Sequence, residues 1–130
     1  MPDPALVRQT AEIISLAEDQ ADAYDRFLSL AQQQTAALAL TDLDEYRRLL
    51  AASIPITDSL AILGIRLCAA MIGWDSSGLP AAFARLGELL RDVHCLQERI
   101  GFEQKKQTRR LAEIHSLYPT PKGGQTDTMP

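Results

Sequence analysis

Apolar residues recur at steps of three and four positions over three long segments, and this spacing constrains the fold more than any other feature. Such steps place apolar side chains on one face of an α-helix. The first segment runs over about residues 4–39, with Asp3 as its expected N-cap. Gln20 and Gln34 fall on its stripe and need hydrogen-bond partners if buried. The apolar members of the stripe are Ile13, Ala17, Tyr24, Phe27, Ala31 and Leu38.

A polar break then predicts a second helix over about residues 42–74. Thr41 is its expected N-cap, and Asp44 three residues later resembles the second half of a capping box. Pro55 lies inside this segment and predicts either a kink or a break into two shorter helices. The stripe of this segment comprises Leu43, Tyr46, Leu50, Leu60, Leu67, Met71 and Trp74.

A loop at residues 75–78 predicts the start of a third helix, over about residues 78–118, with Ser77 as its cap. Pro119 and Pro121 end this helix, and residues 119–130 are expected to be a disordered tail. Its stripe comprises Phe83, Leu86, Leu90, Val93, Ile100, Leu111, Ile114 and Tyr118.

Three segments of similar length with short connections predict one all-α domain over residues 1–118. The expected architecture is three long antiparallel helices in an up-down-up, coiled-coil-like bundle. Apolar residues make up 46% of the chain and aromatic residues only 5%, which suits packing between helices better than sheets.

Charge and hydropathy predict a cytoplasmic protein. The formal net charge of −4 argues against nucleic acid as the main partner. The first residues lack the basic start and apolar run of a signal peptide. The richest apolar run, residues 60–73, contains Gly64 and Arg66 and falls short of the roughly 20 residues of a membrane span. No membrane insertion is therefore expected.

The sequence holds no recognisable catalytic or metal-binding constellation. His94 lacks the basic residue and glycine that follow the histidine of phosphotransfer domains. Neither His94 nor His115 has a glutamate three residues before it, which argues against a di-iron site. Cys68 and Cys95 are expected at different heights, as buried or half-buried free thiols rather than a disulfide or zinc site. We therefore expect no enzyme, cofactor or metal.

The end of the third helix is the candidate partner-binding site. It follows a polar gap in the stripe and precedes the expected tail, so its apolar residues have no neighbour if the helix overhangs the others. The alternative is that this end closes the bundle against Leu6 and Ile13. The candidate residues are Leu111, Ile114, Leu117 and Tyr118.

The first two segments resemble the FlgN-like flagellar export chaperones, small helical proteins of bacterial type III secretion. Residues 24–30 (YDRFLSL) and residues 37–46 (ALALTDLDEY) carry the likeness: a long first helix, a short acidic turn, and a second helix opening with leucine. The resemblance covers about residues 5–118. The chain departs from the family at Gly101 and Gln104, where asparagines are frequent, and in its apolar second segment.

The resemblance implies a function that needs no catalytic residue. Members of the family bind hook-associated proteins before export, receive the cargo's amphipathic terminal helix on their last helix, and deliver the cargo to the export gate. A tyrosine near the C-terminus is associated with gate docking, and Tyr118 matches it by position. The alternatives are another secretion-chaperone subtype and a structural or adaptor coiled-coil protein that scaffolds an assembly without delivering cargo. A homodimer remains open.

Overall fold

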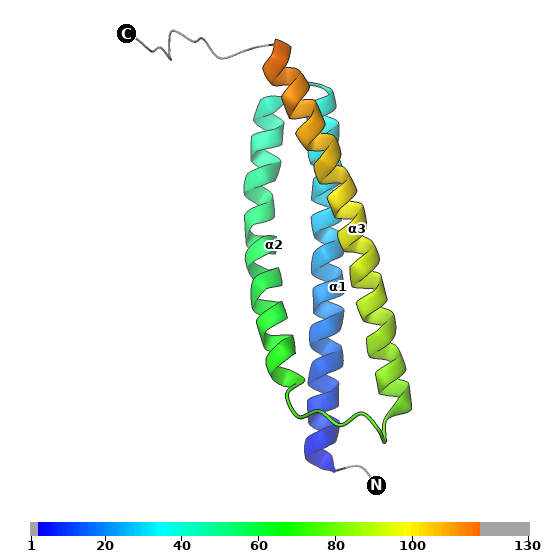
Figure 1. Ribbon diagram of the computed structural model, residues 1–130. Coiled ribbons are helices and arrows are strands. Elements are labelled where there is room, and N and C mark those ends of the chain that lie inside the picture. The colour runs from blue at the N-terminus through cyan, green and yellow to red at the C-terminus, as the bar shows by residue number, and fades with distance from the viewer. Residues whose placement is uncertain (1–2, 118–130) are drawn as a thin grey trace, which may run out of the picture.

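The computed structural model describes residues 3–117, which form three α-helices joined by two short connections (Figure 1). The predicted all-α class with three helices is confirmed, since no strand occurs among these residues. The Asp3 carboxylate accepts a hydrogen bond from the Ala5 amide at 3.2 Å and caps the first helix. The helices are α1 (Pro4–Ala39), α2 (Leu43–Ala70) and α3 (Pro80–Leu117).

The turn between α1 and α2 differs from the prediction by one residue. Thr41 has a left-handed backbone, with φ at 56°. Its amide donates to the Leu38 carbonyl and the Asp42 amide donates to the Ala37 carbonyl, which is the Schellman pattern of a helix C-terminus. Asp42 caps α2 instead, because its carboxylate accepts from the Glu45 amide at 3.1 Å. Thr41 cannot serve as the N-cap, since ending α1 requires a backbone that an N-cap does not adopt.

Pro55 does not break α2. The helix is continuous through this residue, so the expectation of two shorter helices is wrong. Figure 1 shows α2 as a single, gently bowed helix. Pro55 and its neighbours on the outer side are exposed, so water can hydrate the carbonyl group that the proline leaves without a donor. The hydroxyls of Ser53 and Thr57 also donate to the carbonyls of Leu50 and Ser53.

The connection between α2 and α3 begins earlier and ends later than predicted. α2 ends at Ala70 rather than near residue 74, and Gly73 adopts φ of 70° in the following turn. The hydroxyl and the amide of Ser77 both donate to the Asp75 carboxylate, at 2.7 and 3.0 Å, and lower its pKa. Ser77 is thereby engaged within the loop and does not cap α3, which begins at Pro80.

α1 contacts both other helices, and hydrogen bonds define the direction of α2. The side-chain amide of Gln9 donates to the Ala70 carbonyl at 2.9 Å, whereas that of Gln34 donates to the Leu49 carbonyl at 3.2 Å. The two helices therefore run in opposite directions. The partner that Gln34 requires is thus provided by the backbone of α2.

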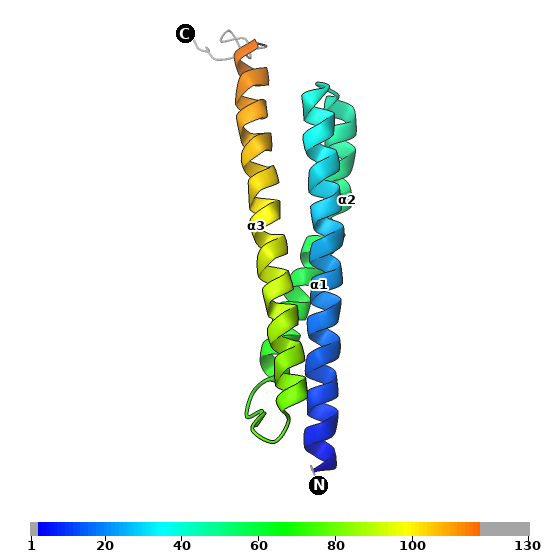
Figure 2. The ribbon, with the colours of Figure 1, turned by 90° about the vertical axis from the view of Figure 1, so that its right-hand side faces the viewer.

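α3 runs in the same direction as α1 and packs on a different side of α1 from α2 (Figures 1 and 2). Arg85 forms an ion pair with Glu18 at 3.3 Å near the start of α3, and Gln107 reaches Ala31 much farther along. No Cα atom of α2 lies within 8 Å of a Cα atom of α3. The three helices share a core only near the α2–α3 connection, formed by Ile13, Leu16, Ala17, Leu67, Leu86 and Leu89.

Candidate functional site

Two rows of residues on α3, each repeating every seven positions, have opposite environments. In a bundle whose three helices all touch, both rows would be covered. No Cα atom of α2 lies within 8 Å of a Cα atom of α3, and the covered row is the one that faces α1. The buried row comprises Leu86, Val93, Ile100, Gln107 and Ile114. The exposed row, called here the open row, comprises Phe83, Leu90, Gln97, Gln104 and Leu111.

The open row corrects the predicted core. Phe83, Leu90 and Leu111 were expected on the buried stripe of the third helix, but all three are exposed. The seven-residue spacing of these residues was visible in the sequence. Which of the two rows would lack a partner was not, because that depends on where α2 lies.

The contact between α3 and α1 becomes polar towards the C-terminus of α3. Gln107 is buried, and its side-chain amide donates to the Ala31 carbonyl at 2.9 Å and to the Thr35 hydroxyl at 3.3 Å. This is the region where the stripe loses its apolar residues. The Gln107 side-chain amide, bonded to a backbone carbonyl of α1, joins the helices here between the buried residues Ile100 and Ile114.

Glu103 adds a largely buried charge to the same contact. Its carboxylate lies 3.0 Å from the Lys106 ammonium group. Burial is the largest single influence and raises the pKa of Glu103. Hydrogen bonds from Lys106 and Thr35, together with the charges of Lys106 and Arg99, outweigh it and hold the pKa below its usual value. Glu103 is therefore a charged member of the α1–α3 contact at neutral pH.

Arg110 ties the last part of α3 to the α1–α2 turn. Its guanidinium group donates to the Leu38 carbonyl and to the Thr41 hydroxyl, each at 3.0 Å. Ile114 is buried beside this turn and borders a pocket of about 450 Å³ that Leu43 and Leu111 also line. The alternative contact with Leu6 and Ile13 is wrong, because α1 and α3 run in the same direction and those residues lie near the opposite end.

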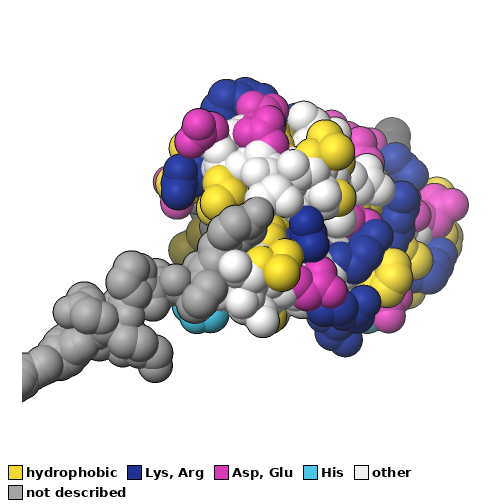
Figure 3. Space-filling view, turned by 90° about the horizontal axis from the view of Figure 1, so that it is seen from above, with side chains coloured by type: hydrophobic (Ala, Val, Ile, Leu, Met, Phe, Trp, Pro, Cys, Tyr) yellow, Lys and Arg dark blue, Asp and Glu magenta, His cyan; other side chains and the backbone are white. Residues whose placement is uncertain are grey.

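The structure separates the three predicted partner-binding residues that it describes. Leu111 belongs to the open row and Ile114 to the buried row. Leu117 is 66% exposed, where α3 extends past the α1–α2 turn in both views (Figures 1 and 2). Tyr118 lies outside the described residues. Figure 3 looks down on this end and shows hydrophobic side chains in separate patches among polar and charged ones.

α2 carries a second exposed apolar surface, on the side away from α1. Only Leu49 and Leu67 are buried in this helix, and Leu50, expected on its stripe, is exposed. The apolar runs in the sequence were judged too short to span a membrane. α2 is nevertheless long and apolar enough to cross one, and among the helices described it is the only such helix. However, Asp58 lies near its middle, exposed, where a bilayer is least favourable to charge, and Arg66 is exposed four residues before its end.

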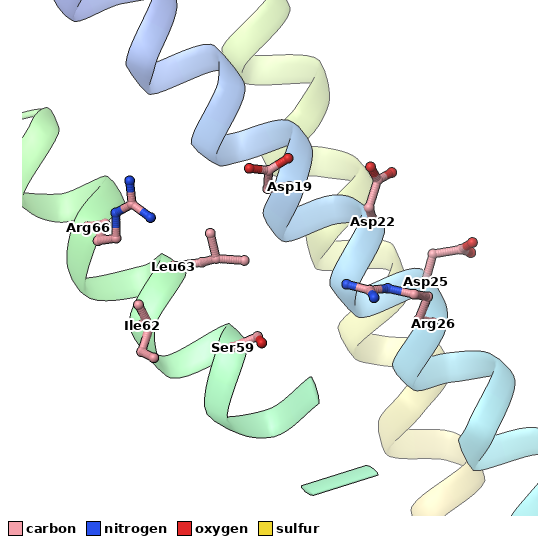
Figure 4. Close-up of a pocket in the computed structure, with 8 residues that line it drawn as sticks. All are labelled: Asp19, Asp22, Asp25, Arg26, Ser59, Ile62, Leu63 and Arg66. Atoms are coloured by element: carbon pink, nitrogen blue, oxygen red, sulfur yellow. The ribbon is translucent and has the colours of Figure 1, made fainter. Parts of the chain in front are cut away.

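A groove with mixed charge runs between α1 and α2 (Figure 4). It has a volume of about 640 Å³ and is open to solvent. In Figure 4 Leu63 points from α2 towards α1, whereas Asp25 points away from α2. The groove therefore resembles an ordinary solvated seam between two helices. Its lining residues are Asp19, Asp22, Asp25, Arg26, Ser59, Ile62, Leu63 and Arg66.

The rare reactive side chains do not converge. Cys68 and Cys95 are free and exposed, so the expectation of buried or half-buried thiols is wrong. His94 is exposed, and its Nε2 atom lies 3.7 Å from the Glu98 carboxylate one turn along the helix. Within residues 3–117, no three histidine, cysteine or acidic side chains are grouped so that they could hold a metal ion.

Comparisons with family models, with curated proteins and with solved structures find no match to this chain. Function is therefore inferred from the chain's own surfaces and from the resemblance of its first two helices. Two surfaces stand out: the open row of α3 and the outer side of α2.

Proposed function

We propose that this chain is a cytosolic export chaperone of the FlgN-like type. It binds the amphipathic terminal helix of hook-associated proteins and delivers them to the flagellar type III export gate. The observation that carries the proposal is the open row of α3, whose apolar members Phe83, Leu90 and Leu111 are exposed although they recur at multiples of seven residues. Such a row is suited to an added helix, and the sequence resemblance suggests which helix that is.

The open row has the length and chemistry for helix-in-groove recognition. Phe83 and Leu111 are 28 positions apart, or about 42 Å at 1.5 Å per residue. Phe83, Leu90 and Leu111 offer apolar contacts and Gln104 offers a side-chain amide between them, whereas the Gln97 amide donates to the Tyr24 hydroxyl of α1 at 2.9 Å. The three helices are proposed to form an up-down-up, coiled-coil-like bundle, and a cargo helix with matching apolar residues would pack on the open row of α3.

The C-terminal half of α3 is suited to adjust to a cargo helix. Its contacts with α1 depend on hydrogen bonds from Gln107 and Arg110 and on the charge of Glu103, with only Ile100 and Ile114 as buried apolar residues. Water can replace such hydrogen bonds at modest net cost. Leu117, at the overhanging end, and Tyr118, the next residue in the sequence, are the proposed contacts for the cargo terminus and the export gate.

The proposal is tested by calorimetric titration of purified hook-associated proteins into the chain. We expect binding by the full chain and loss of binding on removal of residues 108–130. Phe83→Ala is expected to lower the affinity about tenfold, in the range of a modest interface contact. Phe102→Ala is the matched control: Phe83 is 60% exposed and Phe102 63%, but Phe102 lies off the open row. Equal effects of the two changes would show that the open row is not part of the cargo-binding site.

Leu117→Ala and Tyr118→Ala test the overhanging end separately. Both changes are expected to leave the helical circular dichroism unchanged and to weaken partner binding, because Leu117 is exposed in the free chain. Leu40→Ala is the control, since Leu40 is an exposed leucine at the same end, outside α3. Unfolding of both variants would instead place this segment in the core.

The second candidate function is a structural or adaptor protein that scaffolds an assembly without delivering cargo. The exposed apolar side of α2 favours it, because such a surface suits a stable contact. A stable oligomer that binds no hook-associated protein would support this reading over the chaperone.

A further inference from the structure

The outer side of α2 exposes large apolar side chains to solvent. Ile54, Ile62 and Ile65 are 59%, 57% and 71% exposed. Small residues flank them: Ala51 and Pro55 towards the start of the helix and Ala69 towards its end, all exposed. Small side chains permit the close approach of a second backbone. This side of α2 is therefore shaped for another helix.

The charges on this side are symmetric about one residue. Asp58 lies four positions before Ile62, and Arg66 lies four positions after it. Steps of four keep all three residues on one side of the helix. Among residues 3–117, no oppositely charged group lies within 4.0 Å of Asp58 or Arg66. Asp58 is thus available to a group outside the chain, and Arg66, which lines the groove with Asp19, forms no close ion pair there.

We propose that α2 forms an antiparallel, two-fold symmetric dimer with α2 of a second copy of this chain, centred on Ile62. In such a pair, residue numbers facing one another have a constant sum, so Ile62 meets itself across the axis. Asp58 then faces Arg66 of the partner subunit, and Arg66 faces Asp58 of the partner subunit. Pro55 similarly faces Ala69 of the partner subunit. Because both side chains are small, the two helices can approach each other closely at both ends of the contact.

The same residues argue against other occupants of this surface. A parallel pair would place Asp58 opposite a second aspartate and Arg66 opposite a second arginine, which is repulsive. A bilayer would surround both charges with hydrocarbon and supply no partner for either. An antiparallel second copy satisfies both charges and covers Ile62 and Ile65.

The dimer is independent of the proposed cargo site. The open row lies on α3, and no Cα atom of α2 comes within 8 Å of α3. Ile62 and Arg66 also border the groove that Asp19 lines, and Figure 4 shows both on the α2 wall of that groove. Asp58 does not line the groove, so its substitution reports on the dimer alone.

Charge reversal tests the register by sedimentation equilibrium of the full chain. Asp58→Arg and Arg66→Asp, each alone, are expected to weaken self-association at least tenfold, because each creates two like-charge contacts. The double variant is expected to dimerise as the wild type does. A mixture of the two single variants is expected to form a heterodimer, since each then supplies the charge that the other lacks. Asp92→Arg, a reversal at an exposed site on α3, is the control and should leave self-association unchanged.

Cross-linking tests the symmetry. In a chain with Cys68→Ser and Cys95→Ser, Ile62→Cys is expected to form an intermolecular disulfide readily on mild oxidation. Ile72→Cys should not, because the antiparallel register places it opposite Ala52 of the partner subunit. Cross-linking at both positions would indicate a parallel pair and overturn the proposal.

Two further outcomes would also overturn it. One is a wild-type chain that remains monomeric throughout the concentration range of the sedimentation experiment. The other is a monomer that floats with phosphatidylcholine vesicles and loses this property on Ile62→Arg, which would assign the surface to lipid. Loss of dimerisation with cargo binding intact would separate this inference from the proposed function.

Discussion

The guanidinium group of Arg110 donates a hydrogen bond to the Leu38 carbonyl oxygen, 3.0 Å away, and so joins α3 to the last turn of α1. Carbonyl groups at a helix C-terminus lack intrahelical donors and carry partial negative charge, so a cation is a favourable partner for them. The same group also reaches the Thr41 hydroxyl in the turn. This side chain thus acts with Gln107 and the buried Ile114 to hold the C-terminal part of α3 in place.

Arg110→Ala is expected to lower the free energy of unfolding by about 1–2 kcal/mol, since two charge-assisted hydrogen bonds are lost at a partly exposed site. Urea denaturation measures this loss. Hydrogen exchange should show faster exchange of the amides of residues 111–117 in particular. Arg109→Ala is the control, because Arg109 is exposed and makes no such bond to α1. Equal effects of the two substitutions would contradict the role given to Arg110.

Thr41→Gly is expected to relieve backbone strain. A β-branched residue with φ of 56° is unfavourable, and a left-handed residue costs about 1–2 kcal/mol relative to glycine. In wild type the gain is partly offset, because the Thr41 hydroxyl accepts a hydrogen bond from Arg110. In the Arg110→Ala background this offset disappears, so Thr41→Gly should stabilise the chain more there than in wild type. Thermal unfolding of the four chains measures the coupling, and strict additivity would refute it.

Acidification is expected to loosen the α1–α3 contact through Glu103. The pKa of Glu103 in the folded chain is lower than usual, so the unfolded chain takes up a proton first as the pH falls. The stabilisation is present above the unfolded-state pKa and is lost as pH falls through the folded-state value, from about pH 5 downwards. Glu103→Gln should therefore flatten the pH dependence of the urea midpoint in this range. Unchanged pH dependence would show that other carboxyl groups dominate.

Pro55→Ala is expected to raise the free energy of unfolding by about 1–3 kcal/mol, because it restores a backbone donor inside a continuous helix. Pro80→Ala is the matched control: Pro80 is the first residue of α3, where proline is well tolerated. Thermal unfolding compares the two variants. A lower melting temperature for Pro55→Ala would show that the bow of α2 is required by the fold.

Local signals identified the helices, and the reason is that helix formation depends on neighbours in sequence. The stripe of α1 placed Ile13, Ala17, Ala31 and Leu38 in the interior, and all four are buried. The residues that cap the helices were harder to predict from the sequence. Thr41, Asp42 and Ser77 all have side chains suited to capping, and competing backbone hydrogen bonds decided which residue served.

The sequence by itself determined that the chain forms three long helices, that α1 has one apolar face, and that Gln34 needs a partner if buried. Only the tertiary structure decided which apolar residues are covered. Leu86 and Leu90 have similar side chains and lie four positions apart, yet Leu86 is buried against α1 and Leu90 is exposed. Periodicity states that a face is apolar, whereas its cover depends on the distance to the next helix, which is set by packing between distant segments. Because no Cα atom of α2 comes within 8 Å of α3 and the two helices share a core only near their connection, the chain keeps two apolar surfaces, the open row and the outer side of α2, available to partners.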